Sequence, residues 1–287
     1  MRAVDIIQDG QVLDLGELEG PLLVFGGPYS NLQATQAVQQ LATGLGLAPQ
    51  QVICTGDLVA YCGDPCGTAK AIRQWRIPVV MGNCEESLAS DADHCGCGFS
   101  EGSACDLLAS SWYEFASQAV SEDLKEWMGA LPRRIEFQMG GKSFAVIHGG
   151  VDQINQFIFA STAVNEKYQQ LNTLDVDVII GGHCGIPFGQ RLGARVWLNA
   201  GAIGMPANDG TQDGWYMLLS ETKKGIECCW QRLAYDAEGA YQKMQTVGLN
   251  RGYDRALING LWPSTDVLPS DEKNREEMPL DLETIII

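Results

Sequence analysis

The stretch 176–185, VDVIIGGHCG, sets a short apolar run directly before glycines and a histidine. Three earlier stretches also set an apolar run before glycine and a polar residue, namely 52–58 (VICTGDL), 77–85 (IPVVMGNCE) and 143–150 (SFAVIHGG). Each apolar run has the length and composition of a buried strand. Polar residues at the ends of such strands meet in one crevice of an α/β sheet, where ligands bind in these folds. The four stretches therefore predict an α/β protein with one ligand site.

Four ligand-type side chains follow these strands, and they are Asp57, Asn83, His148 and His183. A carboxylate, an amide oxygen and two imidazoles form a suitable cage for one divalent cation. The imidazoles favour zinc, iron or manganese over calcium or magnesium. Each fragment alone is equally typical of turn chemistry, because Gly, Asp and Asn are common after strands. Their repetition in a fixed order favours a metal site.

In order and content, the four stretches resemble the calcineurin-like metallophosphoesterase family. That family's pattern runs Asp-x-His, Gly-Asp, Gly-Asn-His-Asp or Glu, a single His, and Gly-His-x-His. The resemblance covers roughly residues 20–220 and includes 199–202 (NAGA), which is similar to the family's Asn-Pro-Gly-Ser segment. Stretch 56–63 (GDLVAYCG) most resembles a divergent bacterial branch. The resemblance implies a four-layer α/β/β/α sandwich and metal-dependent hydrolysis of phosphate esters.

The chain departs from the family pattern where a first metal ion would bind. Gly27 and Tyr29 stand in place of the Asp and His of the first motif, and Gly185 stands in place of the last His. The second site keeps all its ligands, which the resemblance assigns to Asp57, Asn83, His148 and His183. We therefore expect one divalent transition metal (Zn, Mn or Fe), with the second ion in doubt.

A further departure is Cys84, which replaces the His of Gly-Asn-His. The resemblance implies that this His protonates the leaving oxygen or steadies the transition state. A thiol is a weak hydrogen-bond donor with an unperturbed pKa near ~8.5, so we expect Cys84 to be a soft metal ligand or a filler. Tyr29, Asn31 and Cys184 are further candidates for contacts with a metal or substrate.

The chain contains ten cysteines, which is many for a protein expected in a reducing compartment. A candidate structural zinc site lies in a Cys-rich insertion near 88–106, and it consists of His94, Cys95, Cys97 and Cys105. A further hypothesis is a thiol or metal sensor, in which Cys84 reacts faster than Cys54 with thiol reagents.

The net charge and hydropathy of the chain limit the kinds of molecule that it is expected to bind. The formal net charge is −17, which argues against nucleic acid because the phosphate backbone would be repelled. No run of ~18 apolar residues and no signal-like N-terminus occur, which predicts a cytoplasmic protein without a membrane partner. The expected partner is a small phosphorylated molecule or phosphate, and homo-oligomerisation is left open.

The length predicts a single metallophosphoesterase-like domain over 1–260 and a C-terminal arm over 261–287. Residues 1–19 are expected to form an N-terminal arm. Two runs at 134–138 and 142–147 flank a glycine turn and predict a β-hairpin.

Together these features predict a metal-dependent phosphoesterase of low or altered activity. The alternative is a non-catalytic protein on the same fold that binds a metal or phosphate and serves regulation.

Overall fold

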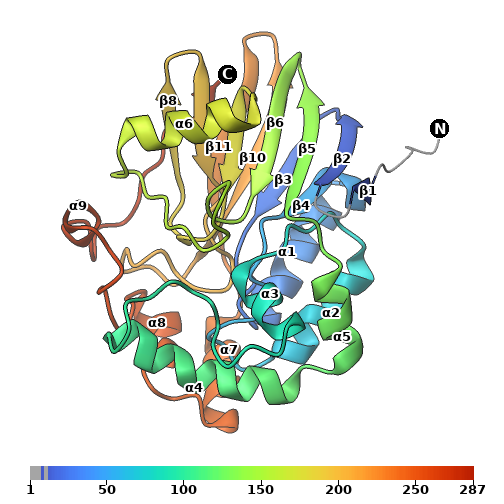
Figure 1. The fold of residues 1–287 in the computed structure, drawn as a ribbon. Helices are drawn as coiled ribbons and strands as arrows, with labels where there is room; N and C mark the ends of the chain where they lie inside the picture. The colour runs from blue at the N-terminus through green and yellow to red at the C-terminus, as the bar shows by residue number, and fades with distance from the viewer. Residues whose placement is uncertain (1–7, 10–11) are drawn as a thin grey trace.

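A computed structural model of the protein describes residues 8–9 and 12–287, and within them two β-sheets pack face to face (Figure 1). One sheet has seven strands in the order β1 (Gln8–Asp9), β2 (Val12–Glu17), β5 (Arg134–Met139), β6 (Lys142–Ile147), β7 (Val178–Gly181), β9 (Arg195–Asn199) and β8 (Phe188–Leu192). The other has five, in the order β12 (Ile285–Ile286), β11 (Gly225–Leu233), β10 (Gly214–Thr222), β3 (Leu22–Phe25) and β4 (Val52–Cys54).

Strand β3 shows why the sequence needs four layers. All four of its side chains are buried, and successive side chains of a strand point to opposite faces. Leu22 and Val24 join the apolar cluster between the sheets, whereas Leu23 and Phe25 pack against helices. A strand covered on both faces has no polar side, which explains the continuous apolar runs.

Helices cover the outer face of each sheet. The five-stranded sheet packs against α1 (Leu32–Gly44), α2 (Pro65–Trp75) and α7 (Ala237–Val247). On the seven-stranded sheet, Leu171 of α6 (Val164–Leu174) lies in one cluster with Ile179 and Trp197. The predicted α/β/β/α architecture is therefore confirmed.

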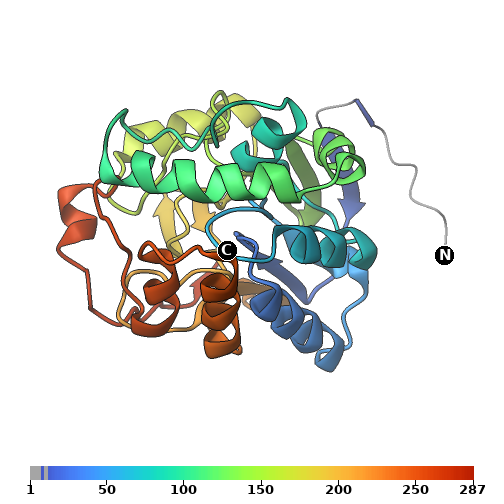
Figure 2. The same cartoon turned by 90° about the horizontal axis from the view of Figure 1, so that it is seen from below.

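The remaining helices complete the end of the sandwich. The helix α4 (Ala104–Ala119) crosses in front of the strands in Figure 2, which views the molecule from below, and α8 (Tyr253–Asn259) lies against α7. The other short elements are α3 (Asn83–Ala89), α5 (Glu122–Gly129), α9 (Ser270–Lys273) and a 3₁₀ turn at Pro49–Gln51. None of the helices in the described part of the chain combines the length and apolar character needed to cross a bilayer.

Strand pairing brings the polar strand ends together. β3 and β4 are parallel neighbours, as are β6 and β7 in the other sheet. The predicted hairpin forms between β5 and β6, with Met139 paired to Lys142. As a result, the loops after β4, β6 and β7 meet at one edge of the two sheets.

The N-terminal region differs from the expected arm over 1–19. Val12–Glu17 is strand β2, which pairs in parallel with β5 and so belongs to the seven-stranded sheet. Leu13 and Leu15 pack against the cluster between the sheets, and an alternation of apolar residues in this stretch was the available signal. Residues 1–7 and 10–11 lie outside the described residues.

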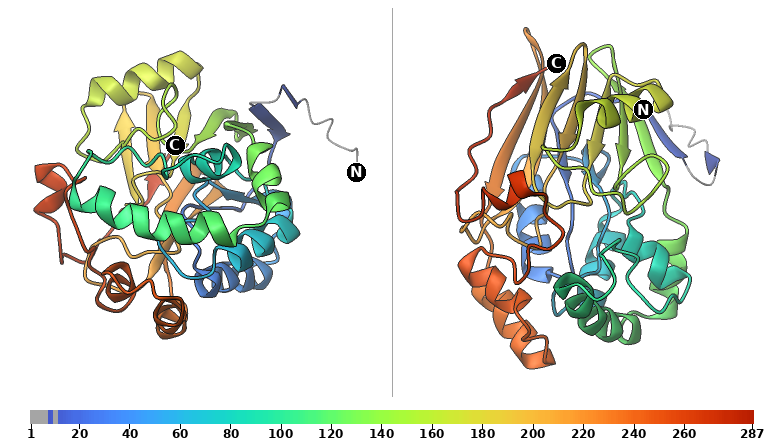
Figure 3. Two further views of the ribbon diagram at one scale, coloured as in Figure 1. Left: turned by 60° about the horizontal axis from the view of Figure 1, so that its bottom comes forward. Right: turned by 60° about the vertical axis from the view of Figure 1, so that its left-hand side comes forward.

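The C-terminal segment 279–287 returns to the five-stranded sheet. β12 lies beside β11 at the edge of the sheet (Figure 3). The backbones of Ile226 and Ile287 exchange two hydrogen bonds of 3.0 and 2.9 Å. Leu280 donates its backbone N–H to the Asp209 carboxylate at 3.0 Å, and its carbonyl accepts from Arg232 at 3.1 Å. The segment therefore ends in a short edge strand, and the division at residue 260 stays a prediction.

Ending the chain at Met278 is expected to lower the free energy of unfolding by roughly 2–4 kcal/mol, because four half-buried aliphatic side chains and the Asp209 contacts are lost. Urea denaturation measures this change. The control is Met278→Ala, whose side chain is 59% exposed, with an expected change of less than about 0.5 kcal/mol. Equal stability of the shortened and full chains would contradict a structural role for β12.

Candidate metal centre

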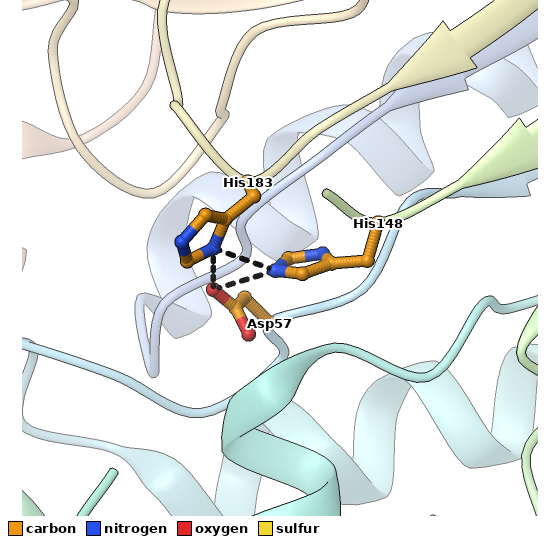
Figure 4. A group of neighbouring side chains, drawn as sticks. All are labelled: Asp57, His148 and His183. Carbon is orange, nitrogen blue, oxygen red and sulfur yellow. Dashed lines mark hydrogen bonds and ion pairs between the residues drawn. The ribbon is translucent and has the colours of Figure 1, made fainter. Parts of the chain in front are cut away.

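Asp57, His148 and His183 converge from both sheets, as Figure 4 shows. His148 Nε2 lies 3.2 Å from Asp57 Oδ2 and 3.0 Å from His183 Nδ1. His183 Nδ1 lies 3.9 Å from the same carboxylate oxygen. All three side chains are buried. Asp57 follows β4, whereas His148 and His183 follow β6 and β7, so each ligand-type side chain extends from the end of a rigid strand.

Asn83 completes the group of predicted ligands. Its Oδ1 lies 3.1 Å from His148 Nε2, and its Nδ2 donates to the Cys95 carbonyl at 2.9 Å. Because a carbonyl only accepts, this second bond fixes the amide orientation with the oxygen toward His148. The structure thus places all four predicted ligand residues around one point.

The tautomer of His148 shows that this point suits a cation. His148 Nδ1 lies 2.7 Å from the carbonyl oxygen of Thr55 and must therefore carry a proton. In the neutral ring, Nε2 is then an acceptor, and it faces the oxygens of Asp57 and Asn83. Three acceptors in contact repel one another unless a proton or metal ion lies among them. The donor set of two nitrogens and two oxygens fits a divalent transition metal.

Charges within the cluster shift its pKa values in different directions. Burial by itself would raise the pKa of Asp57. The nearby imidazoles of His148 and His183 and a backbone hydrogen bond from Cys84 together lower the pKa of this carboxylate. Burial also disfavours a charged His148, yet the adjacent Asp57 carboxylate raises the pKa of that imidazole. Burial and the neighbouring His148 lower the pKa of His183 to about 3. Asp57 is therefore ionised and His183 neutral at pH 7.

The backbone that presents Asp57 is held in an unusual conformation. Asp57 has φ = 56°, in the left-handed region that non-glycine residues rarely adopt. Gly56 has φ = 97°, and a Cβ on it would lie 2.8 Å from the backbone N of Gly82. Strain of this kind persists only where surrounding contacts determine the conformation.

Glu85 supplies those contacts. Its Oε2 accepts from the backbone N–H of Asp57 at 2.8 Å and of Gly82 at 2.9 Å, and its Oε1 accepts from Leu58 at 2.8 Å. Burial and the nearby Asp57 raise the pKa of Glu85 to about 7, against the N–H groups that favour the charged form. Glu85 thus ties the Asp57 loop to the start of α3. This role was not predicted from the sequence, although the position of Glu85 three residues after Gly82, as in a capping box, was an available signal.

The other predicted contact residues lie near the cluster in different roles. Asn31 caps α1, accepting from Ala34 at 3.0 Å, and donates to the Gly204 carbonyl at 3.0 Å. Cys84 is buried 3.5 Å from the Asn83 amide nitrogen, and burial raises the pKa of its thiol. Cys184 contacts Asn199 Nδ2 at 3.2 Å. Their roles toward a metal or substrate stay predictions.

Tyr29 fills space beside the cluster. Its ring is buried, and a Cβ on Gly27 would overlap it. Its hydroxyl lies 3.3 Å from the position of a Cβ on Gly185. The two glycines that replace family ligands therefore both face the same tyrosine.

The Cys-rich insertion has a different arrangement from a ligand cage. A disulfide joins Cys95 to Cys97, His94 Nδ1 accepts from the Gly96 backbone at 3.1 Å, and Cys105 Sγ lies 4.0 Å from the Ser264 carbonyl. Among residues 8–9 and 12–287, the only converging group of three or more His, Cys, Asp or Glu ligand atoms is that of Asp57, His148 and His183. The structure does not bring the four residues of the candidate zinc site together, and that site stays a prediction.

Comparison with known proteins gives consistent matches. A sequence model described as the calcineurin-like phosphoesterase superfamily domain matches residues 31–225. An uncharacterized protein of Methanocaldococcus jannaschii is 24% identical over 242 residues, which cover 78% of this chain and 91% of that protein.

Two crystal structures share the fold. A metallophosphoesterase from Sphaerobacter thermophilus superposes with a TM-score of 0.66 at 19% identity, covering 85% of this chain and all of that one. A hypothetical protein from Pyrococcus horikoshii OT3 superposes with a TM-score of 0.70 at 12% identity, covering 84% and 98% of the two chains.

Two packed sheets with a buried Asp/His/His cluster at their edge define a protein of the metallophosphoesterase class. The family match spans more than half of the chain, and the chain belongs to the calcineurin-like phosphoesterase superfamily. The resemblance inferred from the four motifs is thereby confirmed. Family and cluster together indicate a metal-dependent phosphoesterase.

Replacing Glu85 by Ala is expected to lower the free energy of unfolding by roughly 2–4 kcal/mol, because three buried N–H groups lose their acceptor. Metal affinity is expected to fall about 10–100-fold as the Asp57 loop loses its support. Denaturation and calorimetric metal titration measure the two effects. The control is Glu86→Ala, which removes only a half-exposed pair with Arg133 and should cost less than about 1 kcal/mol. Similar losses in both variants would refute the role of Glu85.

Metal affinity is expected to fall with decreasing pH, because a proton and the ion compete for His148 Nε2. The pKa of His148 lies above its usual value of 6.5, whereas His183 stays neutral down to about pH 3. Between these limits one proton is displaced per ion, and affinity should fall by up to about tenfold per pH unit. Calorimetry in buffers of different ionisation enthalpy counts that proton. Displacement of two protons at pH 5 would contradict this assignment.

Proposed function

We propose that the protein is a phosphoesterase that binds one divalent transition metal ion through Asp57, Asn83, His148 and His183. The observation that carries the proposal is the convergence of acceptors at His148 Nε2, whose lone pair faces the oxygens of Asp57 and Asn83. Two imidazoles in the donor set favour zinc, manganese or iron.

A single ion is favoured over two. The positions that would complete a first site are Gly27, Tyr29 and Gly185, and the two glycines offer no side-chain ligand. The Tyr29 ring packs into the space beside Gly27, and its hydroxyl lies against Gly185. The space beside the cluster is thus occupied by protein.

When bound, the ion would polarise a phosphoryl oxygen and lower the pKa of a coordinated water. The chain's own residues orient and support this centre. The Thr55 carbonyl holds the His148 ring, the Cys95 carbonyl holds the Asn83 amide, and Glu85 holds the loop of Asp57. Burial keeps bulk water away from all four ligand side chains.

Protonation of the leaving group is the weak step of this mechanism. Cys84 occupies the position of the family's acid, but a thiol is a weak hydrogen-bond donor and burial raises the pKa of this one. The expected activity is therefore low toward esters of poor leaving groups. Because the formal net charge is −17, a small phosphate ester is favoured as substrate over nucleic acid.

The same observation favours a second candidate function, a non-catalytic protein that binds a metal or phosphate for regulation. Both functions need the ion, and they differ in turnover. The experiment below therefore measures metal content and hydrolysis on the same samples.

The three histidines of the chain provide a matched set of variants. Elemental analysis is expected to find about one ion per chain in the natural protein and in His94→Ala, and almost none in His148→Ala or His183→Ala. Hydrolysis of a generic aryl phosphodiester, with manganese, zinc or iron added, should fall by at least about 100-fold in the latter two variants.

The outcomes separate the hypotheses. Full metal content in His148→Ala would refute the ligand assignment, and two ions per chain that both remain in His94→Ala would refute the mononuclear site. One ion without turnover would favour the regulatory function. Loss of an ion in His94→Ala alone would support the zinc site of the Cys-rich insertion.

A further inference from the structure

An apolar cleft opens beside the candidate metal centre. His183 lines it, and so does Tyr29, the residue that fills the space next to the metal ligands. Its empty volume, mouth included, is about 500 Å³. The cleft therefore reaches His183, one of the side chains of the candidate metal centre.

Besides Tyr29, five aromatic side chains line the cleft, and they are Tyr61, Phe99, Phe157, Tyr253 and Trp262. Each is only partly buried, so ring surface remains accessible. The Phe157 ring lies 4.2 Å from the His183 ring and 6.0 Å from that of Phe99, measured between centroids. Tyr61 contacts Tyr29 and Tyr253 at 4.9 and 4.5 Å. The rings thus form two series of contacts, from His183 through Phe157 to Phe99 and from Tyr29 through Tyr61 to Tyr253.

The absence of charged side chains from the described lining of the cleft limits which part of a substrate can bind there. None of the described side chains that line it is a Lys, Arg, Asp or Glu. An occupant with further phosphate groups would find no cation here, in a protein of net charge −17. A neutral ring instead buries apolar surface and stacks against the wall in offset or edge-on geometry.

We propose that this cleft binds a single uncharged aromatic ring of the substrate, so that the protein acts on aryl phosphate esters. The inference rests on the proposed function, because the ring is positioned by a phosphoryl group held at the metal centre. Phe99 lines the cleft from the loop between α3 and α4, and Tyr253 lines it from α8. Segments far apart in the chain therefore form one recognition surface.

The test compares two phosphonates that differ only in the group beside the phosphorus. Phenylphosphonate is expected to bind the metal-loaded protein at least about tenfold more tightly than methylphosphonate, because only the former buries a ring. Titration calorimetry measures both affinities without any requirement for turnover. Equal affinities would overturn the cleft proposal while leaving the metal centre intact.

Variants of the cleft lining test where the phenyl ring of phenylphosphonate binds. Phe99→Ala and the cleft-filling Val267→Phe are each expected to reduce the preference to about threefold or less. Both residues are partly buried wall positions, so two independent changes address one cleft. The control is Tyr168→Ala, which removes a 44% exposed ring of α6 outside the cleft and should leave the preference unchanged.

The remaining outcomes are also decisive. An unchanged preference in both folded wall variants would overturn the cleft as the ring site. Failure of both phosphonates to bind the metal-loaded protein would refute the proposed phosphoryl site, and the inference with it.

Discussion

The hydrogen bond between His148 Nδ1 and the Thr55 carbonyl is the contact on which the site depends. Thr55 follows a strand of the five-stranded sheet, whereas His148 follows a strand of the seven-stranded sheet, so this bond of 2.7 Å joins the two layers. The carbonyl of His148 in turn accepts from the backbones of Gly182 and His183, both at 2.8 Å. These hydrogen bonds therefore fix the relative position of the two sheets and the positions of both imidazoles together.

Close packing makes this constraint possible. A Cβ on Gly182 would overlap the Thr55 hydroxyl, and one on Gly26 would do the same from the other side. Only glycine lets the strand ends approach closely enough for the bond to form. The glycines before the ligand residues thus act through contact between sheets as well as through turn geometry.

Local sequence was sufficient for the architecture and for choosing the four side chains that the structure brings together, because a buried strand followed by a polar residue is a short-range pattern. Long-range contacts were not accessible in this way. Glu85 acts through N–H groups up to 28 positions away, and Ile285 finds its partner strand more than fifty residues earlier. The strand Val12–Glu17 was missed because its apolar alternation spans only a few residues.

Tyr29 connects the candidate metal centre with the aromatic cleft. One side of its ring occupies the space next to Gly27, and its edge contact with Tyr61 begins the cleft wall. A smaller side chain at position 29 would open space beside the ligands and remove part of that wall. Tyr29, which stands where the family's first motif has a histidine, therefore packs beside the ligand cluster and shapes the cleft at the same time.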